Sequence, residues 1–207
     1  MEKFKQEMQW EEAKNVVYPA LFPNTKEDLH LLVWEPWLDL AICYVMRGSG
    51  MEDTEHSKMV TKQMMEDWGI DEEMLREQAM QNLQSETCSV CTLGKKIQKM
   101  LEKAGVFVPI PDINPILIVT NDSCEYCAAH MLNSQLLSMI AGEYNLYLMP
   151  INIHDLMVLK VADRSDMIEW VNQWMEEVYL DTASRERLAG HAYFYDRESG
   201  DVELHEQ

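Results

Sequence analysis

The segment from Pro115 to Lys160 constrains the fold most, because it holds three apolar runs and one long helical pattern in close succession. The first run, residues 116–120, has the length and the β-branched content of a buried strand. After an Asn-Asp-Ser turn, Cys124 opens a predicted helix that extends to about Ala141. Residues 144–149 and 155–160 follow as two further predicted strands. The segment therefore predicts a strand, a helix and two strands around one core.

Two more elements extend this pattern toward the C-terminus. Apolar residues at helical spacing mark a helix over residues 165–180, and an aromatic strand follows at residues 191–196. The order from Ile116 to Asp196 is then β-α-β-β-α-β, the pattern of a ferredoxin-like layer. We therefore predict an α+β protein with a mixed or antiparallel sheet and with helices on one face of that sheet.

The first half of the chain carries a different arrangement. Strands are predicted at residues 16–22 and 38–46 with a helix between them, and helical segments follow the Gly48–Gly50 break. We divide the chain into an N-terminal part, residues 1–105, and a C-terminal α+β layer, residues 106–207. A chain of 207 residues is long enough to bury a substantial core, and we expect the two parts to form one compact unit.

Two helical patterns predict which side chains face the core. Leu75, Ala79 and Leu83 recur at four-residue spacing after a predicted Asp71 cap. Trp170 and Trp174 are one helical turn apart, and this spacing is more typical of a core stripe than of a ligand cage.

The net charge of −19 is distributed unevenly. Residues 106–207 hold 17 acids and 5 bases, a balance of −12, and no Lys or Arg lies between Val106 and Leu159. Such a chain repels phosphate backbones, so we expect no direct nucleic-acid binding, whereas the surface would suit a basic protein as partner. The alternative is that the charge serves solubility alone. The candidate partner-binding residues are the five acids of the cation-free stretch: Asp112, Asp122, Glu125, Glu143 and Asp155.

The sequence predicts a cytoplasmic protein without a membrane anchor. No apolar run approaches the roughly 20 residues that cross a bilayer. The first seven residues, Met1–Glu7, lack the charged-then-apolar pattern of a secretory signal. In that compartment the five cysteines are expected to be reduced thiols rather than a disulfide framework.

Two Cys-x-x-Cys pairs are the strongest candidates for chemistry. Cys88 and Cys91 form the first pair, and Cys124 and Cys127 form the second, with His130 three residues further on. Four thiolates can bind zinc tetrahedrally, because this spacing lets both sulfurs of a pair face one ion. The 32 residues between the pairs exceed the usual gap of about 15–20 residues. The alternative is a set of unrelated thiols.

A second interpretation uses Cys124 and Cys127 alone. A strand that leads into Cys-x-x-Cys and a helix is superficially similar to a thioredoxin-type site, where the helix N-terminus favours a thiolate. Against this, Glu125 lies between the cysteines and would oppose a thiolate. His154 and Asp155 lie at a turn between strands, and we expect His154 to cap a turn rather than to act as an acid or base. Nucleophile-elbow, P-loop, dinucleotide and zinc-protease motifs are absent from the sequence.

The chain resembles an uncharacterised family of bacterial domains of unknown function, common in gut clostridia and often encoded near mobile elements. The stretches that carry the resemblance are Val16–Pro19, Leu38–Ala41, Trp68–Ile70, Val119–Asn121, Ala128–Ala129, Leu146–Pro150, His154–Asp155 and Tyr195–Glu198. Family members usually have Gly at the position of Cys127, which argues against a shared cysteine chemistry. The resemblance implies a cytoplasmic module, and it brings no reaction and no functional residues.

Two hypotheses follow from the sequence. The first, which we favour, is a non-enzymatic protein-interaction module that binds a basic protein, in one version an inhibitor of a nucleic-acid-binding defence protein. This version needs no cofactor. The second is a zinc- or thiol-dependent protein built on Cys88, Cys91, Cys124 and Cys127. The sequence does not specify the oligomeric state.

Overall fold

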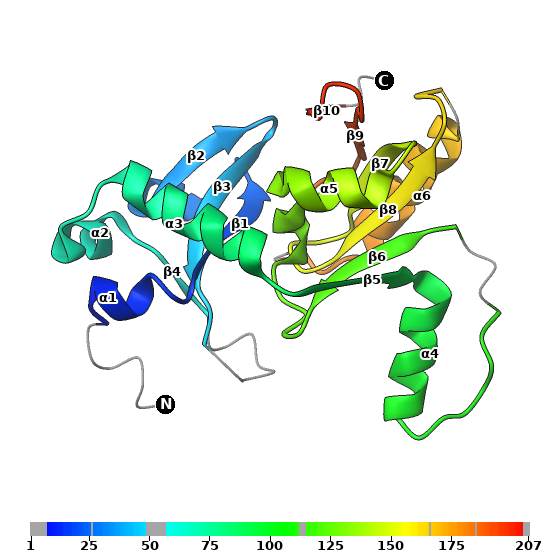
Figure 1. Cartoon of the computed structure of the whole chain (residues 1–207), viewed down its shortest axis with the longest axis horizontal. Helices are drawn as coiled ribbons and strands as arrows, with labels where there is room; N and C mark the ends of the chain where they lie inside the picture. The colour runs from blue at the N-terminus through cyan, green and yellow to red at the C-terminus, as the bar shows by residue number, and fades with distance from the viewer. Residues whose placement is uncertain are drawn as a thin grey trace. The chain divides into compact units, whose positions relative to one another are not determined.

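The computed structural model describes residues 8–25, 27–48, 57–111, 115–165, 167–184 and 186–204. These residues fall into two compact units, Met1–Glu86 and Thr87–Gln207 (Figure 1). The boundary differs from the predicted one at residues 105 and 106. The elements of each unit combine helices with antiparallel sheets, which confirms the predicted α+β class.

The first unit is built on a small antiparallel sheet with the strand order β1-β3-β2 and with β4 paired to β3. Strand β3 is central and is buried along its whole length, as its uninterrupted apolar sequence predicts. The elements are α1 (Trp10–Ala13), β1 (Val17–Pro23), η1 (Glu27–Leu31), β2 (Trp34–Trp37), β3 (Leu40–Met46), β4 (Lys58–Met59), α2 (Lys62–Trp68) and α3 (Glu72–Ser85).

Helix α3 closes the first unit by packing on β1 (Figure 1). The Asp71 side chain caps the helix by accepting a hydrogen bond of 2.8 Å from the Met74 backbone N–H. Leu75, Ala79 and Leu83 are all buried, which confirms the predicted core face. Burying a leucine side chain stabilises the fold by about 1.5–3 kcal/mol. This helix face therefore contributes part of the core of the first unit.

The second unit contains a six-stranded sheet with the order β10-β9-β7-β8-β6-β5, in which every neighbouring pair is antiparallel. Its elements are β5 (Cys88–Thr92), α4 (Leu93–Lys103), β6 (Leu117–Asn121), η3 (Cys127–Leu132), α5 (Ser134–Ala141), β7 (Asn145–Pro150), β8 (Leu156–Val161), α6 (Ile168–Asp181), β9 (Tyr193–Tyr195) and β10 (Val202–Leu204). Strand β5 pairs with β6 over five residues, and this pairing places β5 and α4 in the second unit.

The predicted ferredoxin-like pattern is present in the element order but not in the strand order. Strands β6 and β7 run parallel with β8 between them, which is a split βαβ unit. In a ferredoxin-like layer the last strand then pairs with the first, whereas here β9 pairs with β7. The reason is that β5 and β8 occupy both edges of β6.

Helices cover both faces of the second sheet, so the predicted one-sided arrangement is wrong for this unit. Tyr147 and Met149 of β7 belong to one apolar cluster with Val171 and Met175 of α6. The intervening residue Leu148 points to the opposite face and is also buried. That opposite face is contacted by η3, which packs against β6 and β8.

The predicted helix from Cys124 to Ala141 is interrupted. Cys124 has φ 55° and Tyr126 has φ 53°, and both values lie in the left-handed region that an α-helix excludes. The chain instead forms a turn, then the short 3₁₀ helix η3, and then α5. Asn133 starts α5 by accepting a hydrogen bond of 3.1 Å from the Leu136 N–H.

Asn82 offers a test of how α3 is attached to the rest of the first unit. Its side-chain Nδ2 donates to the carbonyl oxygens of Lys14 at 2.8 Å and Val17 at 2.7 Å. Asn82→Ala leaves both carbonyls without this donor, so we expect the free energy of unfolding to fall by about 1–3 kcal/mol. Urea unfolding of the full chain measures the change. Gln81→Ala, at an exposed neighbouring position of α3, is the matched control and should change stability little.

Candidate functional site

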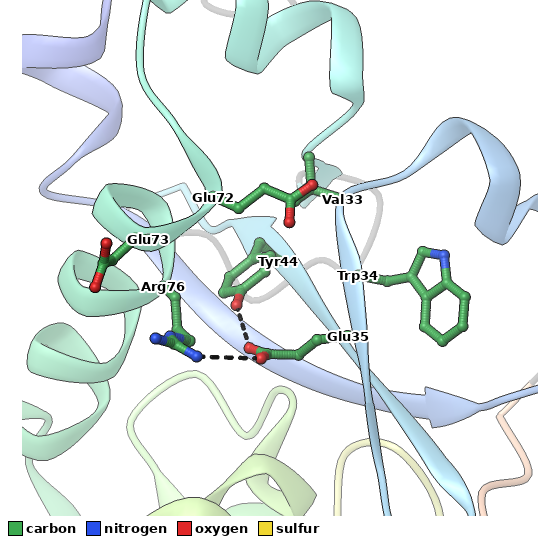
Figure 2. A pocket seen from close by; sticks show the side chains of 7 residues that line it. All are labelled: Val33, Trp34, Glu35, Tyr44, Glu72, Glu73 and Arg76. Atoms are coloured by element: carbon green, nitrogen blue, oxygen red, sulfur yellow. Dashed lines mark hydrogen bonds and ion pairs between the residues drawn. The ribbon is translucent and has the colours of Figure 1, made fainter.

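The first unit contains an open pocket of about 350 Å³ between β2, β3 and the start of α3 (Figure 2). Three carboxylates and one guanidinium line it, so its formal charge is −2. Known ligand pockets begin at about 300 Å³, so this pocket has room for one side chain or a small molecule. The lining residues are Val33, Trp34, Glu35, Tyr44, Glu72, Glu73 and Arg76.

Glu35 is held in the pocket by two partners. The Tyr44 hydroxyl donates a hydrogen bond of 2.7 Å to Glu35 Oε1, and Arg76 Nη1 lies 3.6 Å from Glu35 Oε2 (Figure 2). Burial of Tyr44 raises the pKa of its hydroxyl well above the usual range, and the hydrogen bond to Glu35 adds to the shift. The hydroxyl therefore stays protonated and keeps donating to Glu35 at physiological pH.

Glu72 and Glu73 occupy the first turn of α3, where the helix dipole favours negative charge. Both residues are exposed, and Figure 2 shows Glu72 extending over Tyr44 toward Val33. Arg76 pairs with Glu35, and among the described residues no ion pair involves Glu72 or Glu73. The pocket thus combines a fixed carboxylate with two that are available to an incoming cation.

Sequence reasoning did not find this pocket. Glu35 meets Tyr44 because β2 pairs with β3 in a register that sets Glu35 opposite Ile42, and Tyr44 is the next residue on the same face. Arg76 comes from α3, more than thirty positions away along the chain. The one available signal was the pair Glu72 and Glu73 after the Asp71 cap, which marks acids at a helix start.

The first Cys-x-x-Cys pair lies on β5, where residues three apart point to opposite faces. Cys88 shares its face with its partner Asn121, and Cys91 shares the other face with Ile118. The Cys88 Sγ atom lies 3.1 Å from Nε2 of His130, a fully buried residue of η3. Cys88 therefore contacts His130, whereas Cys91 points to the opposite face of the sheet.

The second pair lies in the turn before η3. Cys124 is exposed, with its Sγ atom 3.4 Å from Thr120 Oγ1 and 3.6 Å from Lys96 Nζ. Cys127 is buried, with its Sγ atom 3.8 Å from the Glu125 carbonyl oxygen. Because the turn and a 3₁₀ helix follow Cys124, the premise of a thioredoxin-type thiolate at an α-helix start is wrong.

The four cysteines therefore have separate surroundings. Within the described residues of the second unit, no three ligand atoms of Cys, His, Asp and Glu lie within 4.8 Å of one another. The zinc site of Cys88, Cys91, Cys124 and Cys127 stays a prediction, and these positions give it no support.

His154 has the capping role that the sequence predicted. Its Nδ1 atom accepts a hydrogen bond of 3.3 Å from the Tyr126 N–H, and the two rings pack at 5.1 Å. The Asn152 side chain in turn accepts from the N–H groups of His154 and Asp155. Burial lowers the pKa of the His154 imidazole, although the carboxylates of Glu186 and Asp155 act in the opposite direction. The neutral ring thus supports the turn.

The predicted partner-binding acids are placed unevenly. Asp122 and Glu143 are exposed, and Asp155 is half-buried and accepts a hydrogen bond of 3.0 Å from Asn152. Glu125 is only 6% exposed, so it does not present its carboxylate at the surface, and this part of the prediction is wrong. Asp112 lies outside the described residues.

Helix α6 carries an acidic surface that the sequence analysis did not select. Trp170 is 41% exposed and stacks on Trp174 with the ring centroids 6.0 Å apart, so the prediction of a core stripe is wrong for Trp170. Val171 and Met175, which belong to the apolar repeat that predicted this helix, are its buried core residues. The helix contains no Lys or Arg, and its exposed acids are Glu169, Glu176, Glu177 and Asp181.

Comparison with known proteins gives a family and no activity. A family model described as "Family of unknown function (DUF5688)" matches residues 2–197. The chain belongs to this family. The predicted resemblance to a family of unknown function is thereby confirmed, while the clostridial origin and the mobile-element context stay predictions. No curated protein and no solved structure matches the chain.

Among the helices of the described residues, none combines the length and the apolarity that crossing a bilayer requires.

His154 predicts a pH dependence of stability. Because its folded-state pKa is lowered, the unfolded chain binds more protons at this residue, and stability rises with pH. The contribution is fully present above about pH 6.5 and is lost as the pH falls below that value. In His154→Asn the amide oxygen retains an acceptor for the Tyr126 N–H but does not titrate. We expect wild type to lose more stability than this variant between about pH 7 and pH 5.

Urea unfolding of the full chain at both pH values measures this difference. His30→Asn, at an exposed histidine of the first unit, is the control and should keep the wild-type pH dependence. An equal loss of stability in wild type and His154→Asn would show that His154 does not carry the effect.

Proposed function

We propose that this protein is an acidic, non-enzymatic protein-interaction module that binds a basic protein partner. The observation that supports it best is the first-unit pocket, where Glu35, Glu72 and Glu73 surround a cavity with a single base, Arg76. A cavity of this size and charge suits the guanidinium or ammonium group of a partner's side chain.

The charges of the pocket have unequal weight. Arg76 offsets the charge of Glu35, so an incoming cation is attracted chiefly by Glu72 and Glu73. A unit charge pair about 4 Å apart near a protein surface interacts with about 4 kcal/mol before desolvation is subtracted. The net charge of −19 adds a long-range field that steers a basic protein toward the surface and speeds association. In this proposal the pocket binds a basic side chain of the partner, and the net charge increases the rate at which the two proteins associate.

A more specific version concerns the partner. If the protein acts in the cytoplasm beside mobile DNA, as its family resemblance implies, a basic defence protein that binds nucleic acid is a suitable target. An acidic protein can occupy the groove of such an enzyme by presenting negative charge where the phosphates would bind. The module needs no cofactor for this role.

Neutralising the two available carboxylates tests the pocket. The probe is a short arginine-rich peptide, and its binding to the full chain is measured by calorimetry at low ionic strength. In Glu72→Gln/Glu73→Gln we expect Kd to rise about tenfold, equivalent to about 1.4 kcal/mol. The affinity of wild type should itself fall steeply as salt is raised, because exposed charges are screened.

The matched control is Glu12→Gln/Glu66→Gln, which removes the same formal charge from exposed positions of the first unit away from the pocket. Its affinity should stay close to that of wild type. An equal loss in both double variants would mean that net charge alone attracts the peptide, and it would overturn the role of the pocket.

A second candidate function is supported by the contact between Cys88 and His130. A thiol and an imidazole 3.1 Å apart have the geometry of a nucleophile and its base, and Cys88 is only partly buried. In this alternative the Cys88 sulfur attacks a disulfide of the substrate and His130 holds the thiol proton. A mixed disulfide forms, and the departing thiolate takes up the proton. The same pair could instead supply two ligands to zinc.

Thiol labelling separates these alternatives from the binding function. In a Cys124→Ser background, we expect an aromatic disulfide reagent to react with Cys88 about tenfold faster than with Cys91 near pH 6. The site of labelling is found by mass spectrometry. His130→Gln should remove the difference while circular dichroism reports on its folding. Equal rates at Cys88 and Cys91 would end the thiol alternative, and a zinc content well below stoichiometric in purified protein would end the zinc alternative.

A further inference from the structure

Helix α4 and the segment after it expose apolar side chains that the unit does not cover. Of the eleven residues of α4, Gly94 is the buried one. Met100 is 60% exposed, and Phe107, just past the helix, is 79% exposed. Figure 1 shows α4 extending away from the sheet beyond the edge strand β5. We call residues 93–108 the α4 arm.

An arm of this kind gains little from its own unit. A helix of eleven residues is marginal in water by itself, and helices in proteins owe most of their stability to packing of an apolar face. The apolar side of α4 continues into the exposed residues Val106, Phe107 and Val108. A contiguous exposed apolar surface beside charged residues is typical of an interaction site.

The charge of the arm identifies the kind of surface that covers it. Residues 93–108 contain four lysines and Glu102, a balance of +3, whereas the rest of the chain carries −19 − 3 = −22. The arm is therefore a basic, apolar projection on an acidic protein. Its complement is an acidic surface with exposed apolar groups.

Helix α6 of the same unit offers that surface. Trp170 and Leu180 supply exposed apolar area on it, and the four acids Glu169, Glu176, Glu177 and Asp181 are exposed around them. A partly exposed tryptophan with a polar rim has the composition of an interface centre. The α4 arm and α6 thus match in charge and in apolar character.

We propose that two copies of this chain associate, with the α4 arm of each copy seated on α6 of the other. In a reciprocal, twofold arrangement both arms are covered and the assembly ends at two copies. A one-way contact would leave one arm exposed and could add further copies to form a filament. Direct pairing of the two arms is disfavoured because it would bring the lysines of both copies together. The association uses none of the pocket residues, so its failure would leave the proposed binding of a basic partner untouched.

The mass of the full chain in solution is the first measurement. Light scattering after size exclusion should give twice the 24.2 kDa chain mass, 2 × 24.2 = 48.4 kDa, at moderate ionic strength, where salt screens the repulsion between two chains of net charge −19. High salt should shift the mass toward 24.2 kDa, because exposed charge pairs are screened. A monomer at every salt concentration and at high protein concentration would overturn the proposal.

Charge exchange between the two helices is the decisive test. The first variant, Lys95→Glu/Lys99→Glu, makes the arm acidic, and the second, Glu169→Lys/Glu177→Lys, makes α6 basic. Each variant alone places like charges at both contacts and should be monomeric. An equimolar mixture restores opposite charges at both contacts and should recover the dimer.

The control is Lys58→Glu/Lys62→Glu, which makes the same charge change at exposed positions of the first unit and should leave the dimer intact. Circular dichroism confirms that each variant is folded. A wild-type dimer that persists in both exchange variants would mean that another surface holds the copies together. Failure of the mixture to recover the dimer would equally overturn the pairing of the arm with α6.

Discussion

The antiparallel pairing of β5 with β6 is the contact on which the arrangement of the second unit depends. It occupies the remaining edge of β6, so β9 must extend the sheet beside β7 and the ferredoxin-like order cannot form. It also places Cys88 on the face covered by η3, which is why this thiol meets a histidine that lies 42 residues away. Because α4 follows β5 directly, the same pairing starts α4 at the edge of the sheet, from which it extends away. One strand of five residues therefore sets the boundary between the units, the strand order and the position of α4.

Burial and hydrogen bonding decide which carboxylates of this protein are available at the surface, and the net charge alone does not show this. Glu125 contributes to the net charge but is buried, and Asp155 is engaged by Asn152, so neither adds a free carboxylate to the surface. Glu72 and Glu73 differ because α3 stabilises acids at its N-terminus while leaving their side chains at the pocket mouth. The acids of α6 lie beside an exposed tryptophan, where desolvation by a partner would strengthen each ionic contact. A cation-free stretch of sequence was thus a poor guide to which carboxylates are available.

The sequence predicted those elements whose apolar pattern is strong and local. Strands β3, β6, β7 and β8 and the core face of α3 follow directly from runs or four-residue repeats of apolar residues. Strand β5 was not predicted, because its residues, Cys-Ser-Val-Cys-Thr, form neither a continuous apolar run nor a strict apolar–polar alternation. They form a strand because they pair with β6. The pocket and the contact between Cys88 and His130 depend on register and on helix packing. Spacing along the chain does not determine such distances. A sequence pattern could therefore identify Cys88 and His130 as candidates but could not predict that they are in contact.

The turn from Asn121 to Cys127 holds two residues in an unfavourable backbone conformation, and this turn determines the exposure of Cys124. Cys124 and Tyr126 both have positive φ, which is unfavourable for residues with a side chain. The turn is held by Asn121, whose side chain donates to the Glu125 carbonyl at 2.8 Å and accepts from the Glu125 N–H at 3.1 Å. His154 adds a second support by accepting from the Tyr126 N–H, which requires the neutral imidazole that burial favours. The exposure of Cys124 is therefore a consequence of a turn fixed by its neighbours. The exposure of Cys124 therefore does not indicate a reactive thiol. Cys88 differs because the pairing of β5 with β6 holds its sulfur next to His130.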